Sequence, residues 1–123
     1  MKYLILIHSN PQSRKIWEGF SGEQRAAGFG AYARLNDDLA ASGELIVSEA
    51  LADPSLGKRL PASDRRVLTA DGPFAEVKEH LAGFFLLECE GFERALEIGA
   101  LVPEAALGLV EVRPVLDLKG RDI

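Results

Sequence analysis

Residues 69–90, TADGPFAEVKEHLAGFFLLECE, decide the fold, because they join a stiff turn to the most apolar strand of the chain. Within that strand, residues 84–87 are Phe-Phe-Leu-Leu, and their side chains project alternately to its two sides. A strand with one face in water should alternate apolar and polar residues. Both faces of this strand must therefore be covered.

The turn before the strand contains Asp71 and Gly72, a strong turn pair because glycine accepts a positive φ and aspartate can bond its own downstream backbone. Pro73 has no N–H, so it cannot close a plain two-residue hairpin. Asp71 therefore lies at the mouth of a stiff, irregular turn. Its carboxylate either satisfies backbone groups of the turn or is held over a pocket.

Residues 75–82, between the turn and residues 84–87, fit both a helical spacing and a strand-like alternation, and we expect a short helical or irregular stretch there. It brings charged side chains close together, among them Glu76, Lys78 and His80. Such a run either forms a solvated face or the rim of a pocket. In the second case, Phe74, Glu76 and Lys78 would contact a ligand.

Length and charge set the class of protein. At 123 residues the chain is one domain, residues 1–123, and its net charge of −5 gives no basic surface for nucleic acid. No apolar run approaches the roughly 18 residues of a membrane span. A single cysteine, Cys89, makes no internal disulfide, which fits a reducing cytoplasm. Since the sequence has neither a glycine-rich phosphate loop nor Cys/His metal spacing, we expect no cofactor and no metal.

Apolar periodicity and capping signals predict the other elements. Helices are expected over residues 21–42 and 91–99, and strands over residues 2–8, 44–51, 65–69 and 107–115. Ser21 and Gln24 have the spacing of a capping box at the start of the first helix. Residues 9–20 are expected to form a loop.

Three side chains outside the turn have both a structural and a functional interpretation. His8 ends the first strand beside Leu6, where its imidazole is either a satisfied strand end or a proton-transfer group. Tyr32 lies on the inward stripe of the first helix, as a core residue or as a hydrogen-bond donor to a pocket. Trp17 either caps the core or lines the pocket.

The order of elements is strand, helix, strand, inserted short strand and turn, strand, helix, strand. This is the α+β pattern of the ferredoxin-like βαββαβ fold, in which both helices cross on one side of an antiparallel sheet. The other face is then bare, yet two of the strands are apolar on both faces. The simplest cover is a second copy of the chain, so we expect a homodimer, a dimeric α+β barrel.

Residues 71–88, DGPFAEVKEHLAGFFLLE, resemble the signature of the DGPF branch of the YCII-related family. MKYLILIHS at the start, YARLNDDLAASGEL over residues 32–45 and VEVRPV over residues 110–115 are similar to that branch as well. The resemblance implies the dimeric α+β barrel of muconolactone isomerase-like proteins.

Enzymatic activity is suspected in the YCII-related family because of a histidine on the first helix and an aspartate near the end of the second. Tyr32 falls at that histidine position and Val102 near that aspartate position. The resemblance therefore does not bring a His–Asp mechanism to this chain. Some members of the DGPF branch resemble partners of extracytoplasmic-function sigma factors, which implies a role near transcription control.

Three functions remain open. The first is a cofactor-free enzyme of isomerase or lyase type on a small organic substrate, with His8 or His80 as the base. Asp71 would orient that base, and Tyr32 would donate a hydrogen bond to a developing oxyanion. The second is a non-catalytic, ligand-sensing or regulatory dimer, linked to a sigma factor through the resemblance. The third is a scaffold whose turn is only structural.

Overall fold

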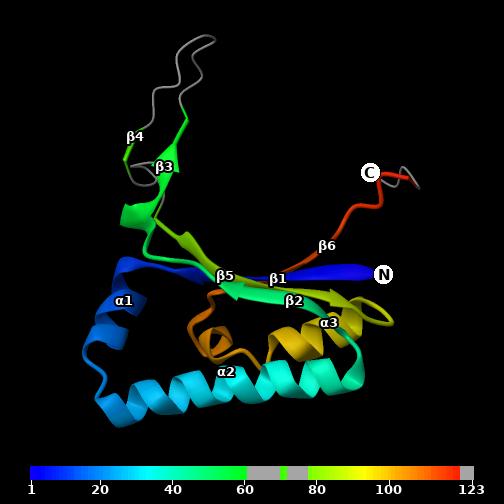
Figure 1. Cartoon of the computed structure of the whole chain (residues 1–123), viewed down its shortest axis with the longest axis horizontal. Coiled ribbons are helices and arrows are strands. Elements are labelled where there is room, and N and C mark those ends of the chain that lie inside the picture. The colour runs from blue at the N-terminus through cyan, green and yellow to red at the C-terminus, as the bar shows by residue number, and fades with distance from the viewer. Residues whose placement is uncertain (61–69, 72–77, 120–123) are drawn as a thin grey trace.

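The computed structural model describes residues 1–60, 70–71 and 78–119 (Figure 1). Its main sheet is antiparallel and four-stranded, in the order β2-β5-β1-β6. These strands are β1 (Lys2–Ser9), β2 (Leu45–Ala50), β5 (His80–Glu88) and β6 (Val110–Pro114). The helices are α1 (Pro11–Glu18), α2 (Gly22–Ser42) and α3 (Phe92–Gly99), with short 3₁₀ helices η1 (Pro54–Leu56) and η2 (Pro103–Leu107).

This arrangement confirms the predicted ferredoxin-like α+β fold. The two central strands, β1 and β5, are the two whose sequences are apolar on both faces, and they pair along their whole length from Lys2↔Glu88 to Ser9↔His80. The shorter strand β6, which ends in Pro114, lies at an edge, where a missing N–H is tolerated. None of the helices in the described ranges is long and apolar enough to cross a membrane.

The hydrophobic core lies between the sheet and the layer formed by α2 and α3, which Figure 1 shows together on one side of the sheet. Its largest cluster draws on both central strands, on α2, on α3 and on the turn after α3. The members of this cluster are Ile5, Ile7, Leu35, Leu39, Phe85, Leu87, Ile98 and Val102. A smaller cluster contains Tyr3, Cys89 and Ala95, and the side chain of Val112 packs against both clusters.

The opposite side of the sheet, which we call the open face, is also apolar at its centre. Leu4 pairs with Leu86 and Leu6 with Phe84, so these four side chains share one face, and each is half-buried. At one edge of this face, Arg113 makes an ion pair with Glu111 at 2.7 Å. The sheet thus has the two apolar faces that its sequence predicted.

Residues 11–18 form helix α1, so the predicted loop over residues 9–20 is wrong there. Asn10 is the N-cap and accepts a hydrogen bond from the Ser13 N–H at 2.7 Å, while Ser13 Oγ accepts one from the Asn10 N–H at 2.9 Å. Pro11 follows at the first helical position, where its missing N–H costs nothing. The Asn10-Pro11 pair therefore begins a helix within the predicted loop.

Two other boundaries differ from the prediction. The strand that contains residues 84–87 begins at His80, so residues 80–82 are extended rather than helical or irregular. The last strand begins at Val110, because residues 103–107 form η2. In α3 the side chain of Ile98 is buried, whereas Phe92 and Leu96 are 41% and 51% exposed.

The inserted part of the chain contains a small two-stranded sheet. Strand β3 (Lys58–Arg59) pairs with β4 (Ala70–Asp71) in antiparallel register. It projects from the main sheet on the side away from α2 and α3 (Figure 1). The strand expected over residues 65–69 lies outside the described residues.

Candidate active site

A cavity of about 370 Å³ lies between α2 and the β2–β5 side of the sheet. Its apolar wall includes Ile7, Phe29 and Phe85, and its polar side chains are Tyr32, Asn36, Ser48 and Glu104. An apolar pocket of a few hundred Å³ with a few polar groups is typical of small-molecule sites.

The most unusual contact in the cavity joins Tyr32 on α2 to Glu104 on η2. The phenol donates a short hydrogen bond to Glu104 Oε1. The Tyr32 ring lies nearly parallel to the Phe85 ring, with 6.3 Å between ring centroids and 10° between planes. Burial, reinforced by the hydrogen bond to Glu104, raises the pKa of Tyr32 far above its usual value. Tyr32 is therefore neutral at physiological pH and acts as a donor.

A second polar pair lies one helical turn further along α2. Ser48 on β2 donates its hydroxyl hydrogen to Asn36 Oδ1, and Asn36 Nδ2 donates to the Tyr32 carbonyl oxygen at 3.0 Å. Residues four apart on a helix lie on the same side. Asn36 thus ties β2 to the turn of α2 that holds Tyr32.

Backbone forms part of the cavity wall at Gly83. A Cβ at this position would lie 2.9 Å from the Glu49 carbonyl oxygen, so only glycine allows the two strands to approach this closely. Glu49 pairs with Phe84, and the register directs both side chains to the open face. These two residues therefore reach the cavity through their backbone.

Neither of the two predicted histidines lines the cavity. His8 belongs to the open face, where its Nε2 lies 3.5 Å from Glu111 Oε1. His80 lines a separate shallow hollow together with Asp53 and Leu81. His8 lies outside the cavity because side chains alternate along a strand. Ile7 faces the helices, so the next residue, His8, points to the open face.

Trp17 supports the wall of the cavity from behind. Its ring packs edge-on against Phe29 at 5.3 Å between centroids, and the Arg25 guanidinium lies 5.5 Å from the centroid of the same ring. A Cβ on Gly28 would be 3.4 Å from the ring, so this glycine gives the tryptophan room beside α2. Trp17 joins α1 to α2 and holds Phe29 in place.

The predicted residues of the turn are only partly described. Asp71 pairs with Lys58 through its backbone in the small sheet, and its side chain is not described. Phe74 and Glu76 lie outside the described residues, and Lys78 is exposed in the bend before β5. Of the eight predicted site residues, Tyr32 is the one that lies in the cavity wall within the described part of the chain.

Sequence reasoning missed Glu104. It placed the family's acidic position at Val102, which is buried in the core with 1% exposure. The turn that begins at Pro103 carries the chain back under α2, and Glu104 then faces Tyr32. The sequence signal was Pro103-Glu104, since proline followed by an acidic residue is typical of the first turn of a short helix.

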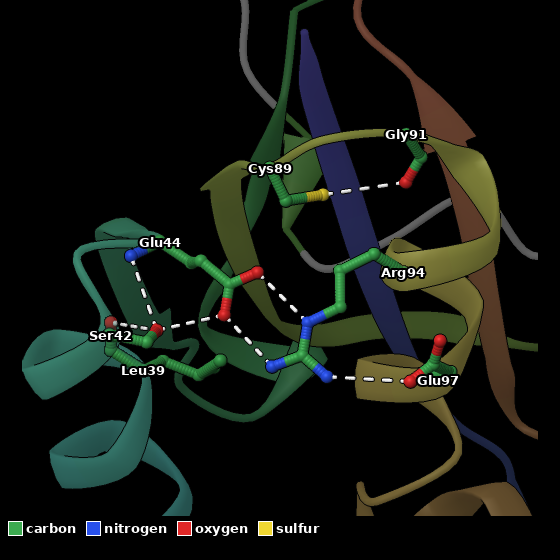
Figure 2. Close-up of polar contacts among 7 residues, drawn as sticks. All are labelled: Leu39, Ser42, Glu44, Cys89, Gly91, Arg94 and Glu97. Atoms are coloured by element: carbon green, nitrogen blue, oxygen red, sulfur yellow. Dashed lines mark hydrogen bonds and ion pairs between the residues drawn. The ribbon is translucent and has the colours of Figure 1, made fainter.

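A separate polar cluster holds the two main helices together (Figure 2). Arg94 on α3 donates two hydrogen bonds of 2.9 Å to the carboxylate of Glu44, which follows α2, and Ser42 donates to the same carboxylate at 2.8 Å. The hydrogen bonds from Arg94 hold the pKa of Glu44 below its usual value. This cluster is a structural clamp and has no residue in the cavity wall. Within the described ranges, no three His, Cys, Asp or Glu side chains are placed to hold a metal ion.

The fold and cavity together define a ferredoxin-like α+β protein with a ligand-sized hollow under its longest helix. The YCII-related domain matches residues 1–119, so the chain belongs to the YCII-related family. An uncharacterized protein, R00369, of Rhizobium meliloti (strain 1021) is 28% identical over 117 residues, which is 94% of this chain and 92% of the relative.

Among solved structures, the chain is similar to the 5-chloro-2-hydroxyhydroquinone dehydrochlorinase TftG from Burkholderia phenoliruptrix AC1100, determined in complex with 2,5-dihydroxybenzoquinone. The TM-score is 0.53 and the identity 18%, with 99% of this chain and 100% of TftG covered. At that identity the two chains share the fold.

Proposed function

We propose that this chain is a cytoplasmic, cofactor-free acid–base enzyme of isomerase or lyase type, and that it binds a small organic molecule in the cavity beneath α2. The observation that carries the proposal is the Tyr32–Glu104 hydrogen bond inside the cavity. A carboxylate held against a neutral phenol provides a base and a hydrogen-bond donor at one place.

Glu104 takes the place of the histidines as the base. It accepts a proton from a ligand C–H or O–H, and the electron pair of that bond moves into the ligand towards an oxygen atom. Once protonated, Glu104 no longer needs the Tyr32 hydrogen, so the phenol can turn its O–H to the ligand oxygen. In an isomerisation Glu104 returns the proton to another carbon. In an elimination the electron pair expels the leaving group.

The similarity to TftG supports the lyase type of chemistry. TftG is named as a dehydrochlorinase, and a dehydrochlorination removes a proton and a chloride. Its structure holds 2,5-dihydroxybenzoquinone, a single flat ring. The present cavity, with its parallel Tyr32 and Phe85 rings, has walls suited to a flat ring.

The proposal includes a homodimer formed through the open face. Leu4, Leu6, Phe84 and Leu86 form its apolar centre, and the Arg113–Glu111 ion pair stands at its edge. An apolar centre with a charged rim is the composition of a protein interface. A second copy is the occupant that matches this face to itself about a two-fold axis.

The test is proton exchange in D₂O, which detects proton abstraction whatever product is formed. Lactones, phenols and small carboxylates are incubated with the protein, and loss of ligand C–H signals is followed by proton NMR. We expect one class to exchange, Glu104→Gln to slow exchange by more than about 100-fold, and Tyr32→Phe to slow it by about 10- to 100-fold. Glu93→Gln, an exposed glutamate on α3, is the matched control.

Two results would contradict the proposal, the first its enzymatic activity and the second the role of Glu104. Binding that depends on Tyr32 and Glu104 but produces no exchange would favour the alternative, a ligand-sensing dimer that regulates a protein partner such as a sigma factor. Exchange that survives Glu104→Gln unchanged would remove Glu104 from the mechanism.

A further inference from the structure

The polar groups of the cavity have already used most of their hydrogens. The Tyr32 hydroxyl hydrogen is donated to Glu104, and the Ser48 hydroxyl hydrogen is donated to Asn36. A hydroxyl has one hydrogen and two lone pairs, and an ionised carboxylate only accepts. The resting cavity therefore presents oxygen lone pairs to a ligand: at Glu104 and Tyr32 on one side, and at Ser48 on the other.

The charge of the cavity wall also favours a neutral ligand that donates hydrogen bonds. In the part of the chain that the structure describes, the cavity wall contains the Glu104 carboxylate and no Lys, Arg or His. A carboxylate or phosphate on the ligand would face the like charge of Glu104, with no cation among the described wall residues to compensate it. An anionic ligand is therefore disfavoured by charge repulsion from Glu104, and also because its oxygens carry no hydrogen to donate to the acceptors of the wall.

The two groups of acceptors are separated by one turn of α2. Tyr32 and Asn36 are four residues apart, so their Cβ atoms lie about 5–6 Å from each other on the same side of α2. The Phe85 ring lies parallel to the Tyr32 ring, and Phe85 is the strand partner of Ser48 in the β2–β5 ladder. A flat ring with a donor at each of two opposite edges would reach both groups.

We propose that the cavity selects a neutral ring that carries hydrogen-bond donors at opposite edges, of the benzenediol or aminophenol class, and rejects carboxylates. This inference rests on the proposed function, because it names the ligand class of the same cavity. Of the three ligand classes in the exchange experiment, it therefore selects the phenols over the lactones and the carboxylates.

The experiment compares three para-disubstituted benzene rings by isothermal titration calorimetry with the whole chain. Benzene-1,4-diol carries two donors, 1,4-dimethoxybenzene carries the same oxygens without donors, and terephthalate carries two negative charges. We expect the diol to bind at least about tenfold more tightly than the diether, because a site built to pair with O–H groups is left unpaired without them. We expect terephthalate to bind least.

Variants locate the binding and separate charge from hydrogen bonding. Glu104→Gln keeps the shape but removes the charge, so it should weaken the diol about tenfold and reduce the preference for the diol over terephthalate. Ser48→Ala removes an acceptor at the other edge and should weaken the diol several-fold. Glu93→Gln should change none of the three affinities.

Each contrary result has a separate meaning. If the diether or terephthalate binds as tightly as the diol, and Glu104→Gln alters that binding, the cavity is a ligand site but the inferred ligand class is wrong. If none of the three rings binds, the inferred ligand class is wrong, and the exchange experiment with the other ligand classes decides the proposed function separately. If binding is indifferent to both Glu104→Gln and Ser48→Ala, the rings bind outside the cavity and the inferred ligand class is also wrong.

Discussion

Gly99 should resist replacement by alanine although it lies in a helix. This residue ends α3 and is buried, and a Cβ built on it would lie 2.8 Å from Val112 Cγ2 on β6. Real Cβ atoms do not approach so closely, so Val112 or α3 must shift. Val112 has a stiff β-branched side chain and packs against both core clusters, so a shift disturbs both.

The magnitude follows from two opposing terms. Overpacking a core costs about 1–3 kcal/mol, while Gly→Ala in a helix gains at most about 1 kcal/mol. We therefore expect Gly99→Ala to lower the free energy of unfolding by about 1–2 kcal/mol and Tm by roughly 3–10 °C. Gly30→Ala, inside α2 where a Cβ would meet nothing within 4 Å, is the matched control and should raise stability by about 0.5–1 kcal/mol.

The assay is urea and thermal unfolding followed by circular dichroism, at one protein concentration for all variants because association changes apparent stability. The double variant Gly99→Ala with Val112→Ala should lose less than the sum of the two single losses. If Gly99→Ala is stabilised like Gly30→Ala, or if the two losses simply add, then the steric reasoning is refuted.

Three further predictions concern charge and association. Arg94 lowers the pKa of Glu44 in the folded state, so the stabilisation from this pair should be complete above the unfolded pKa near 4.5 and should decline as pH falls through the folded-state pKa. Glu44→Gln should lower the free energy of unfolding by about 1 kcal/mol at neutral pH. The variant should also lose less stability than the wild type as the solution is acidified. Because burial raises the pKa of Tyr32 above the unfolded value of 10.0, stability should fall as pH rises past about 10, and this fall should be smaller in Tyr32→Phe. Leu6→Glu on the open face should give a 13.3 kDa species in sedimentation, whereas Leu96→Glu on exposed α3 should leave the mass of the wild type unchanged.

Each of these has a contrary result. Equal acid sensitivity of wild type and Glu44→Gln would show that the clamp in Figure 2 contributes nothing to stability. Equal alkaline sensitivity of wild type and Tyr32→Phe would mean that the phenol ionises freely in the folded protein. If the wild type sediments as a monomer at every concentration tested, the proposed homodimer is refuted.

The sequence predicted the sheet better than it predicted the site. Strands apolar on both faces belong at the centre of a sheet, and β1 and β5 are there. Strand alternation also carried correct information about His8, because it groups this residue with Leu6 on one face. Alternation does not tell which face of the sheet the helices cover, and the packing of α2 and α3 decides which side holds the cavity.

The proposed base of the cavity, Glu104, could not be predicted from strand or helix periodicity. Tyr32 and Glu104 are 72 residues apart in the chain, and no local pattern links them. Helix α1 was missed for a local reason, as Asn-Pro begins both turns and helices, and no residue of α1 is buried enough to give an apolar stripe. Long-range pairs and short solvent-facing helices are the features that periodicity detects least well.

The position of β1 bears on how the molecule forms. This strand comes first in the chain, yet it hydrogen-bonds on its two sides to β5 and β6, which lie beyond residue 79. It therefore has no sheet partner until most of the polypeptide is available, and loops of some 70 to 110 residues must close before either ladder can grow. We expect the chain to fold on the millisecond-to-second scale rather than in microseconds, with Tyr3, Ile5 and Ile7 unprotected from other chains in the interval.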